Sequence, residues 1–343
     1  MSGNMKERNK KDDILICESE RIWQMKAVAI LFVVCAHCAG VLDTATIYST
    51  HISLFMQSLG SLGVPVFFML SGYLFKYKPF KVWWRAKIMN LVLPWLFCGA
   101  IVYIYMCIRK GGFSLIGLVK WCVGYNTYLW FMTVTLVMIV LAECISYLCT
   151  VFNCKEEFVW GTWILVCILF LFLERYRIIV MLPYLNPFRW GWIFGLGVLL
   201  KKHISIGSLP VFPYSVLLGI IMVCWGTWKF GIITYWSRAW WCFALMVIVC
   251  ALPFYVSRFY IGKIISQIGK RSFSIYLLHM PIAGAVANLL NCISDPIGIS
   301  VIIRPIIVIA ITYAGILVML RAVDVFIKIE KISRILRLLI GVR

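Results

Sequence analysis

The stretch "KAVAILFVVCAH", Lys26 to His37, is an apolar segment with a cation at one end and an imidazole at the other. Apolar runs of this kind recur from residue 22 to residue 327, in a chain of 343 residues that is 63% hydrophobic and only 13% charged. This composition excludes a soluble domain. It is typical of an all-α, polytopic integral membrane protein.

Segments of about 17 to 25 mostly apolar residues can cross a bilayer as helices. We expect about ten of them, near 22–42, 54–75, 88–107, 128–149, 158–174, 178–200, 210–228, 236–257, 272–292 and 299–322. The segment 178–200 is interrupted by Pro183 and Pro187. These prolines favour a loop or re-entrant piece before a shorter span that begins near Phe188.

An even number of spans puts both termini on one side of the membrane. With both termini in the cytosol, 24 of the 33 Lys and Arg residues lie on the inner side, as the positive-inside rule requires. The net charge of +20 then reflects membrane topology and contact with the lipid bilayer. No basic and aromatic groove indicates a nucleic-acid partner, so we expect a multi-pass protein of a bacterial cell membrane.

Three regions follow from this pattern. Residues 1–21 form a polar, basic cytosolic tail without the features of a cleavable signal peptide, and residues 22–322 form the transmembrane domain. Residues 323–343 carry cations at three-residue spacing among Ile and Leu, which predicts a basic amphipathic helix on the cytosolic leaflet.

Lys26 and His37 are eleven residues apart, which is three helical turns plus about 20° and a rise of about 16 Å. Both should therefore point to one face, with Lys26 near the cytosolic surface and His37 in the outer half. Each has an ordinary alternative, since a terminal Lys snorkels and a buried His can be a packing residue. Cys35, Cys38 and His37 are too few for a structural zinc site, so we expect no metal.

The second predicted span contains Gly60, Gly63 and Gly72, which would allow close helix contact, and Ser71, a polar group near the cytosolic surface. The connection after it carries five cations, including Arg85 and Lys87. They serve either as topology signals or as a site for an anionic cytosolic ligand.

The ninth predicted span opens with Ser272, Tyr276 and His279 at positions i, i+4 and i+7. These three residues form one polar stripe on an otherwise apolar helix. Hydrogen-bonding groups in lipid favour the wall of a cavity over simple packing.

Five motifs of the chain resemble those of the membrane-bound acyltransferase-3 family, in the same order. They are the cation and histidine of "MKAVAILFVVCAH", then "PVFFMLSGYLF", "WWRAKIMNLVLPW", "YLWFM" and "GKRSFSIYLLHMPI", which together extend over residues 26 to 282. The resemblance implies a ten-span enzyme that transfers an acyl group, usually acetyl from acetyl-CoA, to a hydroxyl of a cell-surface polysaccharide or lipid-linked glycan.

The resemblance also implies roles for single residues. His37 would be the general base, Lys26 the cation of the first span and Arg85 the basic residue after the second, while Ser71, Tyr276 and His279 fall on further motif positions. Combined with the chemistry of the residues, this predicts that Arg85, Lys87 and Lys26 bind the phosphates of acyl-CoA and that Ser71, Tyr276 or His279 donates to the oxyanion. Trp130 falls on a further motif position.

Two positions depart from the family pattern. Lys26 stands where Arg is common, and Trp23 stands where many members have Asp. The expected ion pair at the start of the first span is therefore missing. A transporter or exporter of glycan intermediates is the main alternative function, and a sensor or scaffold is a further one.

Overall fold

The computed structural model describes residues 2–39, 52–53, 56–57, 60, 62–78, 80–125, 127–175, 184–203, 260–290, 299–327 and 330–342. Regular structure in these residues is helical throughout. The all-α fold predicted from the composition is confirmed.

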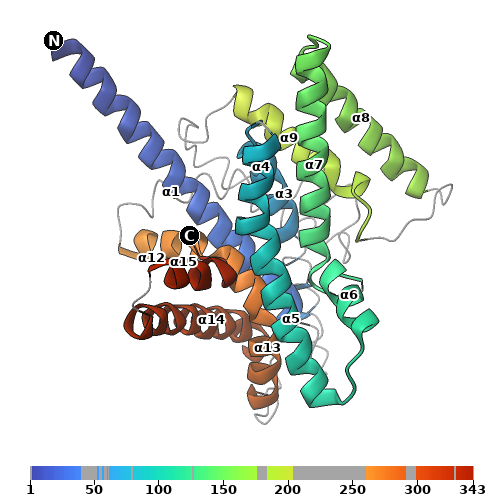
Figure 1. Cartoon of the computed structure of the whole chain (residues 1–343), viewed down its shortest axis with the longest axis vertical. Helices are drawn as coiled ribbons and strands as arrows, with labels where there is room; N and C mark the ends of the chain where they lie inside the picture. The colour runs from blue at the N-terminus through green and yellow to red at the C-terminus, as the bar shows by residue number, and fades with distance from the viewer. Residues whose placement is uncertain are drawn as a thin grey trace. The chain divides into compact units, whose positions relative to one another are not determined.

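The helices follow one another along the chain as shown in Figure 1. They are α1 (Ser2–Cys38), α3 (Gly63–Tyr73), α4 (Phe80–Lys87), α5 (Leu93–Lys110), α6 (Leu115–Val123), α7 (Trp130–Val151), α8 (Glu156–Arg175), α9 (Phe188–His203), α12 (Tyr260–Lys270), α13 (Ser272–Leu290), α14 (Ile299–Phe326) and α15 (Glu330–Leu339). A π-helical turn, Ile88–Val92, joins α4 to α5.

In the described residues, six helical segments are long and apolar enough to cross a membrane: Glu18–Cys38, Val82–Arg109, Trp130–Val151, Glu156–Glu174, Ser272–Leu290 and Ser300–Phe326. Each matches a predicted span. In the described part of the sixth predicted span, helix α9 begins at Phe188, as the two prolines indicated. The predicted spans 210–228 and 236–257 lie outside the described residues.

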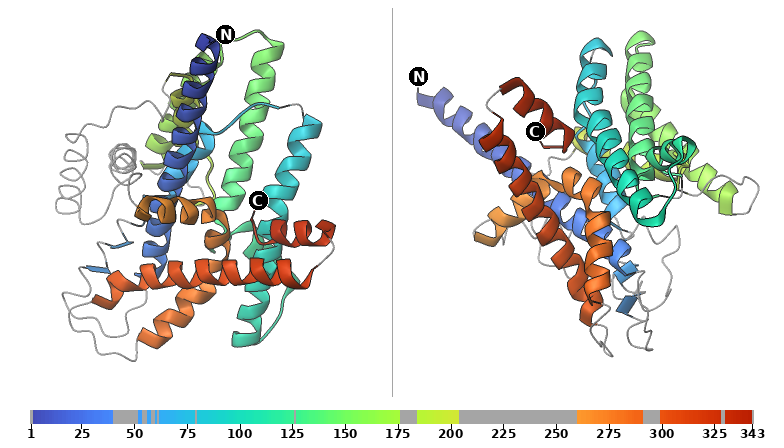
Figure 2. Two further views of the ribbon diagram at one scale, coloured as in Figure 1. Left: turned by 90° about the vertical axis from the view of Figure 1, so that its left-hand side faces the viewer. Right: turned by 60° about the horizontal axis from the view of Figure 1, so that its bottom comes forward.

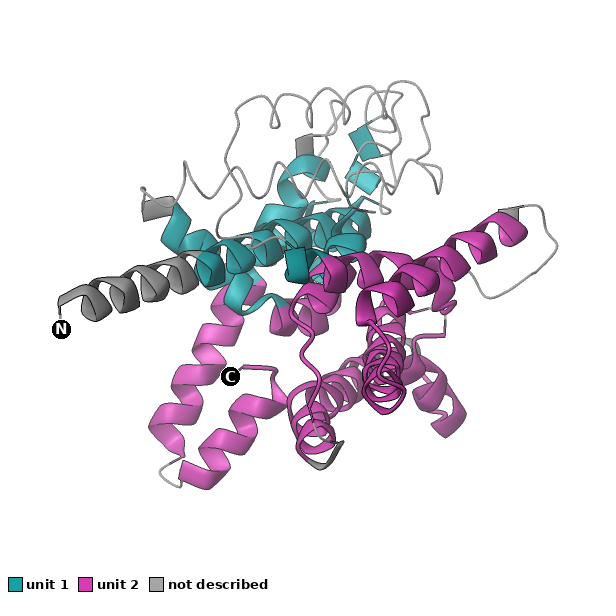
Figure 3. Ribbon diagram, turned by 90° about the horizontal axis from the view of Figure 1, so that it is seen from above, with its two compact units in different colours: residues 1–67, 200–272, 282–311 teal, residues 68–199, 273–281, 312–343 magenta. Residues whose placement is uncertain are grey.

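The chain divides into two compact units, coloured separately in Figure 3. Unit 1 consists of residues 1–67, 200–272 and 282–311, and unit 2 consists of residues 68–199, 273–281 and 312–343. Helices α13 and α14 each contribute residues to both units.

Small residues set the closest helix contacts, as predicted. In unit 1, a Cβ added to Gly60 would lie 2.4 Å from the backbone nitrogen of Ala36, and one at Gly63 would lie 2.4 Å from the carbonyl oxygen of Ala29. In unit 2, a Cβ at Gly72 would lie 2.0 Å from the carbonyl oxygen of Phe194. Any larger residue would force these helix backbones apart.

Four elements were not expected from the sequence: helices α4, α6 and α12, which lie in predicted connections between spans, and the π-helical turn. Helix α12 packs against α1 (Figure 2), and with 11 residues it is too short to span a membrane. The π-helical turn precedes Pro94, whose ring removes one backbone donor from the start of α5. The turn begins at Ile88, directly after Lys87, and connects α4 to the long helix α5.

Helix α15 corresponds to the amphipathic segment predicted near the C-terminus, and it packs against α5. Arg337 on α15 forms an ion pair with Asp324 on α14. The thiol of Cys98 on α5 lies 3.3 Å from the carbonyl oxygen of Leu339. This helix is thus held within unit 2 by polar contacts.

Candidate active site

Lys26 lies on α1 with its ammonium over the ring of Trp23, 4.8 Å from the ring centroid. The two residues are three positions apart on the helix, so their side chains share a face. An aromatic face attracts a cation without taking up its N–H donors. Trp23 therefore supplies a partner at the position where an acid would be expected.

Helix α12 holds this part of α1 in place within unit 1. The side-chain amide of Gln24 donates to the hydroxyl oxygen of Ser266 over 3.2 Å. Gly269 allows the close approach, since a Cβ there would lie 1.7 Å from the carbonyl oxygen of Trp23. One turn before Trp23, Glu18 pairs with Lys201 at 2.6 Å.

His37 lies in the last turn of α1 and is half-buried. Around this turn, Cys35 and Ala39 belong to an apolar cluster with Met56 and Val301 of α14. Lys26 and His37 are thus on one continuous helix, as predicted, and the helix carries them toward different surroundings. Across the described residues, no three side chains of His, Cys, Asp or Glu gather as metal ligands.

Ser71 lies on α3 in unit 2 and is half-buried. The contact of Gly72 with α9 fixes its helix, and Gly197 of α9 makes the reciprocal contact, since a Cβ there would lie 2.1 Å from the carbonyl oxygen of Met69. The backbone of α3 beside Ser71 therefore lies in direct contact with the backbone of α9, which leaves no room for a side chain at either glycine.

Trp130, Tyr276 and His279 meet in one aromatic cluster of unit 2. The ring centroid of Phe131 lies 5.5 Å from that of Tyr276. Trp130, the residue before Phe131 in the chain, stacks on Trp190 with ring centroids 5.2 Å apart. The ring of Tyr128 lies edge to face with His279 at 5.4 Å. Phe68 of α3 joins the cluster through Phe131 at 4.8 Å. The structure thus brings together three predicted site residues and the helix that carries Ser71.

A pair of tyrosines locks α13 to the start of α7. The hydroxyl of Tyr128 donates to the carbonyl oxygen of Leu277 over 2.8 Å, and the hydroxyl of Tyr276 donates to the carbonyl oxygen of Tyr128. Pro281, four residues after Leu277, has no N–H to give that carbonyl its usual helical bond. Tyr128 therefore provides the hydrogen bond that the proline removes.

The hydrogen bonds of His279 determine its tautomer. Nδ1 lies 2.7 Å from the carbonyl oxygen of Tyr276 and 3.2 Å from that of Ile275. Because a carbonyl oxygen only accepts, Nδ1 carries the proton, and in a neutral ring Nε2 keeps its lone pair. The ring is completely buried. Nε2 of neutral His279 can therefore accept a hydrogen bond but not donate one.

Arg85 is exposed at the end of α4, and Lys87 is half-buried two residues later. Sequence reasoning missed the acid nearby, Glu143 of α7. Its carboxylate accepts from the backbone N–H of Lys78 over 3.5 Å, is near the charges of Lys87 and Lys78, and interacts with the buried Trp83 side chain. Glu143 is the one acidic residue in the predicted span 128–149, and an acid inside an apolar span was the sequence signal that could have identified it.

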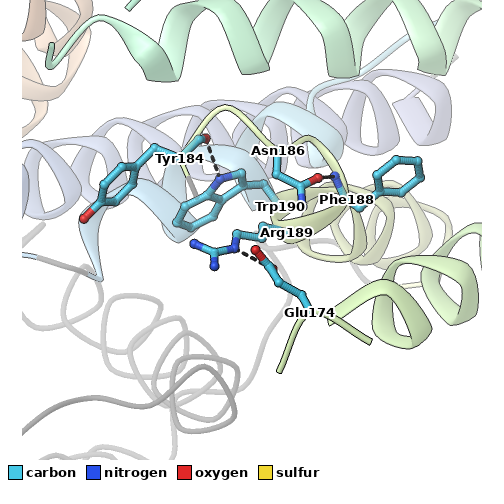
Figure 4. Close-up of polar contacts among 6 residues, drawn as sticks. All are labelled: Glu174, Tyr184, Asn186, Phe188, Arg189 and Trp190. Atoms are coloured by element: carbon cyan, nitrogen blue, oxygen red, sulfur yellow. Dashed lines mark hydrogen bonds and ion pairs between the residues drawn. The ribbon is translucent and has the colours of Figure 1, made fainter. Parts of the chain in front are cut away.

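A second missed ion pair, between Glu174 and Arg189, joins α8 to α9 (Figure 4). Glu174 and Arg189 are 2.7 Å apart with side chains only 13% and 10% exposed. Asn186 caps α9 by accepting from the N–H of Phe188, and the indole of Trp190 donates to the carbonyl of Tyr184 (Figure 4). These bonds fix Trp190, on which Trp130 stacks.

The candidate residues divide between the units. Lys26 and His37 belong to unit 1, while the remaining candidates belong to unit 2, namely Ser71, Arg85, Lys87, Trp130, Tyr276 and His279.

A family model described as an acyltransferase domain matches residues 21–321, which is most of the chain. The chain belongs to the acyltransferase 3 family. The matched range extends from Arg21, at the turn before Lys26, to Arg321 near the end of α14. No curated protein and no solved structure matches the chain. With its apolar helices, family membership makes the protein a membrane acyltransferase.

Proposed function

We propose that the protein is an O-acetyltransferase that moves acetyl from cytosolic acetyl-CoA to a hydroxyl of a cell-surface polysaccharide or lipid-linked glycan. The observation that carries the proposal is the arrangement of Lys26 and His37 on one helix inside the matched acyltransferase domain. A cation near one membrane surface and an imidazole deeper in the membrane suit a donor that enters from the cytosol.

Three cations bind the phosphates of acetyl-CoA in this proposal: Lys26, Arg85 and Lys87. Arg85 is exposed and offers a two-pronged grip on phosphate. Lys26 adds an ammonium charge, and its contact with Trp23 is made with the ring face. Each of the three side chains thus brings the positive charge that a phosphate ligand requires.

His37 acts as the general base. It takes the proton of the acceptor hydroxyl while the hydroxyl oxygen attacks the thioester carbonyl. Of the three proposed oxyanion donors, Tyr276 already donates to Tyr128, and neutral His279 presents a lone pair at Nε2. Ser71 keeps the donor role, and we assign Tyr276, His279 and Trp130 to the support of the site.

The deciding experiment uses purified protein in lipid nanodiscs with acetyl-labelled acetyl-CoA and a polysaccharide acceptor. We expect wild-type protein to release CoA and label the acceptor, and His37→Ala to lower kcat about 10²- to 10⁴-fold. His203→Ala, at the exposed end of α9, is the matched control and should keep wild-type rates. Full transfer by a well-inserted His37→Ala variant would overturn the base assignment.

The same purified protein, reconstituted into sealed lipid vesicles, separates the enzyme from an exporter. Glycan flux across vesicles with no consumption of acetyl-CoA would favour transport and refute the proposal. The acceptor itself is tested by deleting the gene and measuring O-acetyl groups on envelope glycans. Loss of these groups from one glycan class would identify the acceptor, and unchanged acetylation of every class would contradict the glycan assignment.

A further inference from the structure

Arg304 is a buried arginine inside the apolar helix α14. Its exposed fraction is 2%, and it lies within the segment Ser300–Phe326, which is apolar enough to cross a membrane. Arg321, on the same helix, is exposed. Burial of a guanidinium in such surroundings is costly, and arginines kept there usually serve a function.

The surroundings of Arg304 include the end of α1 that carries His37. Val301, one turn before Arg304, packs in the apolar cluster with Cys35 of α1 and with Ala39, the residue after the end of α1. The charge of Arg304 also acts on the thiol of Cys38, the residue directly after His37. These residues all belong to unit 1, so the contacts lie within one compact body. The guanidinium therefore borders the turn of the proposed base.

We infer that Arg304 is a further catalytic residue, whose guanidinium binds the oxyanion formed when the acceptor attacks the thioester beside His37. This inference rests on the proposed function and adds a residue to it. By charge alone, Arg304 is one of the nine Lys and Arg residues that the predicted topology places on the outer side.

The step in which Arg304 acts can be written in full. The acceptor hydroxyl gives its proton to His37, its oxygen bonds to the thioester carbon, and the carbonyl electron pair moves onto oxygen, next to Arg304. When the carbonyl re-forms, the carbon–sulfur bond breaks and the CoA thiolate takes the proton from His37. Arg304 neither gains nor loses a proton in this sequence.

An arginine suits this role for two reasons. Its guanidinium stays charged and has five N–H donors, so it can bind an oxyanion while keeping another contact. In an apolar setting, a fixed cation also stabilises developing negative charge more strongly than it would in water. A purely structural arginine would instead hold α14 against α1 without any effect on the chemical step.

The test compares Arg304→Gln and Arg304→Lys with the matched control Arg321→Gln in the acetyl-transfer assay. We expect Arg304→Gln to lower kcat about 10²- to 10³-fold, the loss typical of one oxyanion donor. The KM for acetyl-CoA should change by less than about threefold, because Arg304 binds the oxyanion that forms in the transition state and not the bound substrate. Arg321→Gln should match wild type.

Two further measurements separate catalysis from structure. Methylguanidine should restore part of the kcat of Arg304→Ala, because it returns the missing group, and it should not change wild type. If Arg304→Gln fails to insert into the membrane, Arg304→Lys provides the test. Lysine keeps the positive charge but lacks the planar set of N–H donors, so kcat should still fall. Wild-type kcat in Arg304→Lys, or an inserted Arg304→Gln with unchanged kcat, would overturn the inference.

Failure of the proposed function gives a different result. If wild-type protein transfers no acetyl group, the proposed function is wrong. If wild type is active, His37→Ala is inactive and Arg304→Gln keeps full kcat, only the role of Arg304 is refuted.

Discussion

The polar residues of α1 in unit 1 and those of the aromatic cluster in unit 2 are held in different ways. The ammonium of Lys26 lies over the face of Trp23, a contact made with an aromatic ring and not with a hydrogen-bond acceptor. Tyr276 has one hydroxyl proton, and that proton already bonds to the Tyr128 carbonyl. An ammonium that rests on a ring face can still bind an anion, whereas a hydroxyl whose only proton is already bonded is better suited to support.

This difference predicts two classes of variant. Substitutions in the cluster of unit 2 should lower stability and leave the rate of the folded fraction unchanged. Substitutions on α1 should alter kinetic constants and leave stability almost unchanged. Variants at Gly72, Tyr128 and Trp23 test this division between the units.

The largest expected effect is that of Gly72→Ala in unit 2. The added Cβ would meet the carbonyl oxygen of Phe194 at 2.0 Å, so α3 and α9 must separate. We expect a loss of about 2 to 3 kcal/mol in the free energy of unfolding, measured by denaturant titration in mixed micelles. Gly161→Ala on α8 is the control, because an added Cβ there meets no atom within 4 Å. Equal stability of the two variants would contradict the close contact.

Part of this architecture could be predicted from the sequence. Gly60, Gly63 and Gly72 indicated close contacts because small residues at helix spacing have few other uses in a membrane. The start of α9 at Phe188 followed from Pro183 and Pro187, since proline restricts the backbone locally. Such features depend on neighbours along the chain, which a sequence shows directly.

Other features depend on which helices meet. Nothing near Tyr128 in the sequence indicates that its hydroxyl reaches Leu277, 149 residues away. Glu143 and Arg304 were visible as charges in apolar segments, but their neighbours come from other helices. For the same reason, helix α12 was missed, because its short amphipathic pattern makes sense only against α1.

An intermediate effect is expected for Tyr128→Phe. The change removes the donor that replaces the helical bond lost at Pro281 and leaves the buried carbonyl of Leu277 without it. We expect a loss of about 1 to 2 kcal/mol in unfolding free energy, with kcat of the folded fraction unchanged.

A double-mutant cycle supplies the control for this variant. Pro281→Ala returns a backbone N–H to the helix, so Tyr128→Phe should cost less in that background. An undiminished cost would show that the hydroxyl does not replace the proline's missing donor. If kcat fell while stability stayed at the wild-type level, the tyrosine pair would take part in the chemical step, and the proposed difference between the two units would be wrong.

The smallest expected effect is that of Trp23→Leu on α1. Loss of the aromatic face should raise the KM for acetyl-CoA about two- to fivefold, corresponding to the 0.5 to 1 kcal/mol typical of a cation–π contact. Trp23→Phe keeps an aromatic face and should stay within about twofold of wild type. Neither variant should change kcat, because Lys26 binds phosphate in the proposal and takes no part in the chemical step.

The Trp23 variants need a control for packing, since Gly269 of α12 closely approaches the Trp23 backbone. Lys26→Met removes the cation and keeps a long apolar side chain, so Trp23→Leu should add little to the KM in that background. If Trp23→Leu raises the KM equally with and without Lys26, Trp23 acts through the position of α12. Lys26 and Trp23 would then serve as support as well, and α1 would resemble the cluster of unit 2.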